Sequence, residues 1–129
     1  MMTSVQLVRV LVVEDSLVNQ KMLTALLAQR DCTIEVALDG QEALNILVAS
    51  QFDLILMDVQ MPIMDGLTAT RLIRQQEAAA GRHTTIVAVT AGVDRQECLD
   101  AGMDDHVSKP IRPAVLDELL SRIRHDNSL

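Results

Sequence analysis

The stretch of residues 54–66, LILMDVQMPIMDG, decides the fold, because within it a buried strand runs directly into a polar loop. Four apolar residues precede Asp58, which is the pattern of a strand covered on both faces, as in a parallel sheet. Asp58 closes this strand and opens the loop, so its carboxylate is predicted to be within reach of solvent. Asp65 and Gly66 predict a turn at the far end of the loop.

Other apolar runs and helical patterns alternate with this segment along the chain. Strands are predicted at residues 8–13, 33–37, 54–57, 85–89 and 106–108. Helices are predicted at residues 17–30, 40–50, 67–80 and 113–125, with a short fourth helix between residues 94 and 102. Ser16, Asp39 and Asp94 are the predicted N-caps. Strands that alternate with helices require right-handed crossovers, which predict an α/β fold with a five-stranded, doubly wound parallel sheet.

Composition limits the classes of function. The chain has 129 residues, 49% hydrophobic and 22% charged, which suits one domain with its own core, expected at residues 7–126 between flexible ends at 1–6 and 127–129. The net charge of −7 and the absence of Trp and Tyr argue against nucleic-acid binding. The apolar runs are too short to cross a membrane, and residues 1–6 lack the pattern of a signal peptide. Cys32 and Cys98 are predicted to be free thiols in a reducing compartment, so we expect a cytoplasmic domain.

Polar side chains follow the predicted strands. Glu14 and Asp15 follow the first strand, Asp58 the third, Thr90 the fourth and Lys109 the fifth. Because the carboxyl ends of parallel strands meet at one edge of a sheet, we expect these groups to converge there.

The chemistry of this set indicates phosphoryl transfer. Three clustered carboxylates must bind protons or gain a cation. Their hard oxygen ligands favour Mg²⁺, with Mn²⁺ as a substitute, over Zn²⁺. Thr90 and Lys109 add a hydroxyl and an ammonium group for phosphoryl oxygens. Asp58 is the predicted nucleophile, giving an acyl phosphate.

Four motifs in this order resemble the receiver domain of two-component response regulators over nearly the whole chain. They are LVVED at residues 11–15, the segment 58–66, VTA at 89–91 and SKP at 108–110. Residues 60–66, residues 98–105 and Asn19 are further similar to receivers of hybrid sensor histidine kinases. The resemblance implies a flavodoxin-like sheet of strand order 2-1-3-4-5.

The resemblance also implies a metal site. Asp58 would be the phosphoacceptor. Asp15 and Asp58 would hold Mg²⁺ directly, and Glu14 would act through water. The backbone carbonyl of Gln60 would add a further ligand.

The other implied roles concern the phosphoryl group and the switch. Thr90 and Lys109 would contact phosphoryl oxygens, and the Lys109–Pro110 peptide bond would be cis. Thr90 would also take part in switching, with the mobile switch residue at His106. His106 is smaller and more polar than the usual Tyr or Phe, so we expect weaker or pH-sensitive switching. The 19 positions from Thr90 to Lys109 are fewer than is usual in the family, which predicts a shorter or reoriented fourth helix.

A receiver of this kind takes a phosphoryl group from phosphohistidine on a histidine kinase or a histidine phosphotransfer protein. It accelerates its own phosphorylation and dephosphorylation in cis, without turnover of a free substrate. We expect a monomer or a weak dimer, with no contact to nucleic acid or membrane. The chain is either a stand-alone regulator or a piece of a hybrid kinase, such as the cytosolic part of a membrane-bound sensor kinase.

Two other functions stay open. The first is a receiver-like interaction module that is never phosphorylated and dephosphorylated. Such modules usually lack one of the acids or the lysine, whereas this chain has all of them. The second is a Mg²⁺-dependent phosphatase with an Asp nucleophile, like the haloacid dehalogenases. Those enzymes place a second Asp two residues after the first, where this chain has Gln60.

Overall fold

The computed structural model describes residues 7–127. Of the ends expected to be flexible, 1–6 and 127–129, residues 1–6 and 128–129 lie outside the described residues, whereas residue 127 is the last residue of a helix. The strands are β1 (Val8–Val13), β2 (Cys32–Ala37), β3 (Leu54–Asp58), β4 (Thr85–Thr90) and β5 (Asp105–Ser108). The helices are α1 (Leu17–Ala28), α2 (Gly40–Ala49), α3 (Gly66–Ala80), α4 (Arg95–Ala101) and α5 (Pro113–Asn127).

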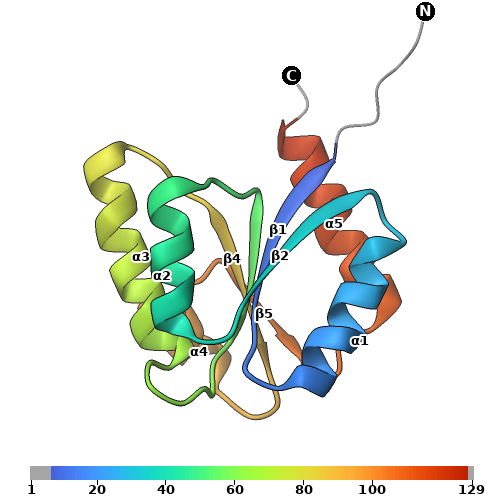
Figure 1. The fold of residues 1–129 in the computed structure, drawn as a ribbon, viewed down its shortest axis with the longest axis horizontal. Helices are drawn as coiled ribbons and strands as arrows, with labels where there is room; N and C mark the ends of the chain where they lie inside the picture. The colour runs from blue at the N-terminus through green and yellow to red at the C-terminus, as the bar shows by residue number, and fades with distance from the viewer. Residues whose placement is uncertain (1–6, 128–129) are drawn as a thin grey trace, which may run out of the picture.

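The strands form one parallel sheet in the order β2-β1-β3-β4-β5. Helices α1 and α5 cover one face, and α2, α3 and α4 cover the other (Figure 1). The predicted fold class and strand order are therefore confirmed. No helix in residues 7–127 is long and apolar enough to span a membrane.

Strand β3 is the rigid centre of the sheet. All five of its residues are buried, because it lies between β1 and β4 and has helices on both faces. Ile55 and Met57 pack on the side of α2 and α3, whereas Leu54 and Leu56 pack on the side of α1 and α5. Burying each of these side chains contributes about 1.5–3 kcal/mol, so the carboxyl end of β3 is firmly positioned.

The capping predictions hold in part. Oγ of Ser16 accepts the N–H of Asn19, and Oδ1 of Asp39 accepts the N–H of Glu42 at 2.9 Å. Asp94 occupies the N-cap position of α4 but makes no side-chain capping bond. Helix α4 spans only seven residues, as the short segment before Lys109 predicts.

Candidate functional site

The predicted site residues meet at the carboxyl edge of the sheet. Glu14 directly follows β1, while Asp58 and Thr90 are the last residues of β3 and β4. Lys109 follows β5 and donates its backbone N–H to the carbonyl of Thr90 at 3.0 Å. The parallel register brings these strand ends side by side, since β3 pairs with both β1 and β4, and β4 pairs with β5.

Three carboxylates form the centre of the site. One oxygen from each of Glu14, Asp15 and Asp58 lies within 4.8 Å of the other two. Glu14 and Asp58 are buried, and Asp15 is exposed at the mouth of the site. The cluster therefore combines two desolvated acids with a third that remains open to water.

Lys109 provides the countercharge. Its Nζ lies 2.9 Å from Oε1 of Glu14 and 3.2 Å from Oδ1 of Asp58. Burial opposes the charged form of Lys109, but its hydrogen bonds to these two carboxylates raise its pKa overall. The ammonium group thus links the first and third strand ends from the fifth.

The two buried acids respond differently to this environment. Burial, followed by the hydrogen bond and the negative charge of Glu14, raises the pKa of Asp58 to about 6. Burial also acts to raise the pKa of Glu14, but bonds from Lys109 and from the backbone N–H of Ser16 lower it overall. The charged form of Glu14 is therefore favoured, whereas burial and the neighbouring Glu14 disfavour the charged form of Asp58.

The donor set fits a hard divalent cation. Three carboxylates face one ammonium, so the ionised cluster keeps an excess of negative charge. The oxygens are close enough to share an ion, and Asp15 leaves one side open to water. Mg²⁺ prefers this combination of a few carboxylates with retained waters.

Backbone contacts hold the acids in place. Oδ1 of Asp58 accepts the N–H of Gln60 at 3.2 Å, and Oε2 of Glu14 accepts the N–H of Ser16 at 3.1 Å. Gln20, which the sequence interpretation missed, donates from Nε2 to the carbonyl of Glu14 at 2.6 Å. The signal was present, because Gln20 is a polar residue in line with the buried residues of α1.

The remaining predicted residues surround this cluster. Gln60 is exposed in the loop that follows β3. Thr90 is buried, and its Oγ1 lies 3.5 Å from the backbone nitrogen of Gly92. His106 is half-buried in β5. The Lys109–Pro110 peptide bond is cis.

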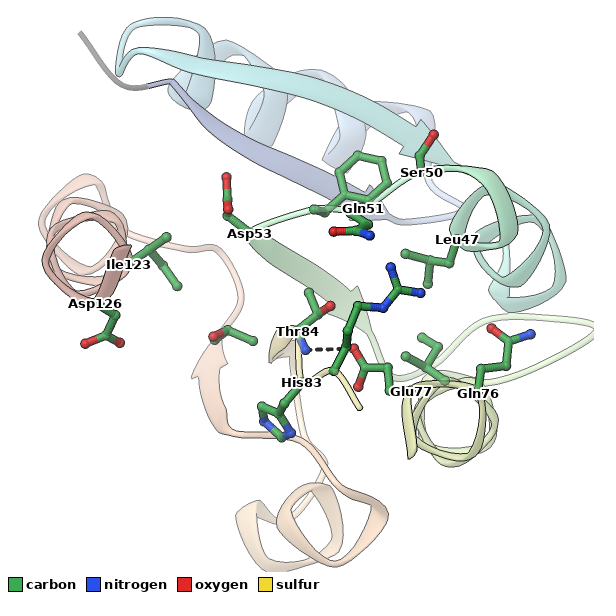
Figure 2. A pocket seen from close by; sticks show the side chains of 14 residues that line it. Leu47, Ser50, Gln51, Asp53, Gln76, Glu77, His83, Thr84, Ile123 and Asp126 are labelled. Atoms are coloured by element: carbon green, nitrogen blue, oxygen red, sulfur yellow. Dashed lines mark hydrogen bonds between the residues drawn. The ribbon is translucent and has the colours of Figure 1, made fainter. Parts of the chain in front are cut away.

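A separate cavity of about 400 Å³ lies where β3 and β4 begin, at the end of the sheet opposite the carboxylate cluster, and Figure 2 shows the side chains that line it. Glu77, His83 and Asp126 line it together with apolar side chains. Both oxygens of Glu77 are already bonded, Oε1 by Arg74 at 2.5 Å and Oε2 by the N–H of Thr84 at 2.7 Å, the latter drawn in Figure 2. This acid therefore has a structural role, and the cavity shares no residue with the carboxylate cluster.

The chain belongs to the response regulator receiver domain family, whose model matches residues 10–121. Hybrid signal transduction histidine kinase I of Dictyostelium discoideum is 45% identical over 121 residues, which cover 88% of this chain and 7% of that protein. Hybrid signal transduction histidine kinase A of the same organism is 40% identical over 119 residues, which cover 88% of this chain and 6% of that protein. The chain thus spans only a small part of the curated relatives that it matches.

Solved structures agree with this family. One is the receiver domain of the response regulator Ssk1 of Saccharomyces cerevisiae, crystallised with the histidine phosphotransfer protein Ypd1, with a TM-score of 0.87, 30% identity and coverage of 95% of this chain and 92% of that chain. Another is the receiver domain of a sensor histidine kinase of Pseudomonas aeruginosa with a magnesium ion in its active site cleft. Its TM-score is 0.82 at 39% identity, covering 91% of this chain and 97% of that chain.

Proposed function

We propose that this domain is the phosphoacceptor of a two-component phosphorelay, with Asp58 as the residue that receives the phosphoryl group from phosphohistidine. One observation carries the proposal: Asp58 ends a buried strand, lies beside two further carboxylates and is 3.2 Å from the ammonium of Lys109. An acid on a rigid strand end, with a cation ready for phosphoryl oxygens, is the arrangement that in-line phosphoryl transfer requires.

The transfer balances without a further reactant. A carboxylate oxygen of Asp58 attacks phosphorus and forms a P–O bond, while the P–N bond to the donor histidine breaks. The electron pair of that bond returns to the imidazole nitrogen, and an acyl phosphate remains on Asp58. Lys109 then neutralises phosphoryl oxygens, and the hydroxyl of Thr90 offers them a hydrogen bond. The same edge of the sheet would position water for hydrolysis, so the domain would catalyse both reactions in cis.

Mg²⁺ is the proposed cofactor, and Mn²⁺ is a substitute of the same ligand preference. Asp15 and Asp58 would bind it directly, Glu14 would bind through water, and the carbonyl of Gln60 would complete the protein ligands. The ion supplies positive charge for the carboxylates and for the incoming phosphoryl group.

The surface next to the site fits a protein donor. Leu17, Val18 and Met22 on α1 are 62%, 67% and 51% exposed. Met22 also borders a mostly apolar hollow of about 220 Å³ that reaches Glu14 and Lys109. An apolar helix face of a histidine phosphotransfer protein or histidine kinase would cover these side chains. The related Ssk1 receiver was crystallised with such a phosphotransfer protein.

The proposed output is a change on the face formed by α4, β5 and α5. The acyl phosphate would draw the hydroxyl of Thr90 toward itself, and His106 would follow into the vacated space. Asp105 connects the three elements of this face, since its carboxylate lies 3.2 Å from the guanidinium of Arg122 in α5 and 3.9 Å from that of Arg95 in α4. A shift of β5 would therefore be transmitted to both helices.

We further propose a cytoplasmic setting, a monomer or weak dimer, and an origin as part of a hybrid kinase. The cysteines Cys32 and Cys98 are both free, as a reducing compartment requires. The acidic composition disfavours a nucleic-acid partner. Similarity to receivers within much longer kinases supports the hybrid origin over a stand-alone regulator.

Acetyl phosphate, a small donor that needs no docking surface, tests the proposal. Incubation with acetyl phosphate and Mg²⁺, followed by intact-mass analysis, should show one added phosphoryl group on the wild-type protein. Asp58→Asn should abolish it, whereas Asp126→Asn, an exposed acid at the opposite end, should not. Failure of the wild-type protein both to bind Mg²⁺ and to accept phosphate would instead favour the non-cycling module.

A further inference from the structure

Ile63 is in a backbone conformation that its side chain disfavours. Its φ is +69°, in the left-handed region, where the branched Cβ of isoleucine is crowded by the backbone. The N–H of Met64 bonds the carbonyl of Pro62 at 2.7 Å, which closes a tight three-residue turn around Ile63. Glycine or asparagine would adopt this conformation at lower cost.

Packing within the domain does not explain the isoleucine. Ile63 is 87% exposed, more than the other large exposed apolar side chains of the described residues. Its loop neighbours Met61 and Met64 pack against the core, but Ile63 does not. The chain therefore places an apolar side chain in water and in a strained turn, and obtains no burial from it.

The position of Ile63 in the fold gives a reason for an exposed isoleucine in this turn. Ile63 lies in the loop that follows β3, five residues after Asp58, and Leu17 and Val18 follow the end of the adjacent strand β1. The loop after β3 and the start of α1 lie at the same edge of the sheet, where β1 and β3 end (Figure 1). Exposed apolar side chains thus lie at this edge of the sheet both in the loop after β3 and in the first turn of α1.

We infer that Ile63 is a specificity-determining contact for the phosphodonor protein, where it inserts into the apolar helix surface beside the donor histidine. This inference rests on the proposed function and adds a residue outside the chemical machinery to it. The hydrogen-bonded turn already presents the side chain to solvent, so little backbone freedom is lost when the partner binds. A histidine phosphotransfer protein is the occupant that the related Ssk1 complex supports.

The test compares a donor that must dock with one that need not. Phosphorylated Ypd1 of Saccharomyces cerevisiae serves as the protein donor and acetyl phosphate as the small donor. For Ile63→Asn we expect at least a tenfold fall in kcat/KM with Ypd1, mainly through KM, and an unchanged rate with acetyl phosphate. The melting temperature should rise, because asparagine relieves the turn.

Two variants serve as controls. Val48→Asn removes another exposed apolar side chain, 76% exposed on α2, and should leave both rates unchanged. Ile63→Leu keeps an apolar side chain and should retain most of the transfer rate. A transfer loss in Ile63→Leu as large as that in Ile63→Asn would count against an apolar contact.

Several outcomes would overturn the inference. An unchanged Ypd1 rate in Ile63→Asn would do so, as would an equal loss in Val48→Asn or a parallel loss with acetyl phosphate. A wild-type domain labelled by acetyl phosphate but not by Ypd1 would contradict the docking contact and leave the phosphoacceptor function standing. Failure of the wild-type domain with acetyl phosphate would instead contradict the proposed function.

Discussion

The ammonium nitrogen of Lys109 lies 3.2 Å from Oδ1 of Asp58, so the proposed phosphoacceptor already has the cation that would meet an incoming phosphoryl group. The same nitrogen is 2.9 Å from Glu14. Lys109 therefore offsets part of the like-charge repulsion between the two buried acids before any metal binds. This relationship leads to the first predictions.

Replacing Lys109 with methionine should destabilise the metal-free protein by about 1–3 kcal/mol, because two buried carboxylates lose their cation. Urea unfolding in EDTA measures this loss. Mg²⁺ should restore much of the stability, since it supplies the missing positive charge, while the rate of acetyl phosphate labelling should stay at least about tenfold below wild type. Equal stability of wild type and Lys109→Met in EDTA would show that the contact contributes nothing.

Asp58→Asn should stabilise the metal-free protein at neutral pH while it abolishes phosphorylation. The neutral amide removes a negative charge that is disfavoured first by burial and then by the neighbouring Glu14, the two causes that raise the pKa of Asp58 to about 6. A shift from 3.8 to about 6 corresponds to a gain of at most about 3 kcal/mol, and about 1–3 kcal/mol is expected. The measurement is again urea unfolding in EDTA, and a less stable Asp58→Asn would contradict the raised pKa.

The pH dependence of stability should have a definite direction. The pKa of Asp58 rises from 3.8 in the ordinary carboxyl to about 6 in the folded protein, so the folded state holds this proton more tightly. The free energy of unfolding should therefore fall as pH rises through the window from 3.8 to about 6. The lowered pKa of Glu14 acts in the opposite direction, so the contribution of Asp58 is isolated as the difference between wild type and Asp58→Asn. Saturating Mg²⁺ should flatten this difference, because it favours the ionised carboxylate.

Arg74 should be a major structural residue far from the site. It donates to Glu77 at 2.5 Å, to Asp104 at 2.8 Å and to the carbonyl of Gly102 at 2.8 Å. Arg74→Met leaves the buried Glu77 without its cation and should lower the free energy of unfolding by about 2–4 kcal/mol. The control is Arg71→Met, an exposed arginine of the same helix, for which a change within about 0.5 kcal/mol is expected. Similar losses in both variants would contradict this assignment.

His106→Tyr should strengthen switching and make it less dependent on pH. Tyrosine fills more of the space that a displaced Thr90 would leave, and it stays neutral where an imidazole changes charge. The measurement is hydrogen exchange across α4, β5 and α5 with and without beryllofluoride and Mg²⁺, from about pH 6 to about pH 8. Equal amplitudes for wild type and His106→Tyr at all pH values would contradict a switching role for His106.

Most of the site could be predicted from the residues that directly follow the strands, because the carboxyl ends of parallel strands meet at one edge of the sheet. Glu14, Asp58 and Lys109 were predicted to meet because each follows a strand of a parallel sheet, and the structure brings their side chains into direct contact. Contacts that depend on packing could not be predicted in this way. Asp94 was expected to cap α4 with its side chain and does not, and Gln20 was not expected to hold the carbonyl of Glu14.

The left-handed backbone conformation of Ile63 is a further feature that could not be predicted from the sequence. Because isoleucine disfavours a positive φ, the amino-acid sequence of this loop does not predict that conformation. The turn is imposed by its anchors, since the N–H of Gly66 bonds the carbonyl of Val59 at 2.9 Å and Met61 and Met64 pack inward. Tertiary contacts override the local preference because together they outweigh its cost.

The amino-acid sequence alone determined the alternation of strands and helices, the sheet class and the edge at which the acids, the threonine and the lysine gather, because hydrophobic periodicity and chain direction are local properties. Only the tertiary structure decided that Lys109 contacts both buried acids, that Asp58 rather than Glu14 has the raised pKa, and that Ile63 faces solvent. The physical reason is that these depend on distances and desolvation between side chains from separate loops, which exist only once the helices pack on the sheet.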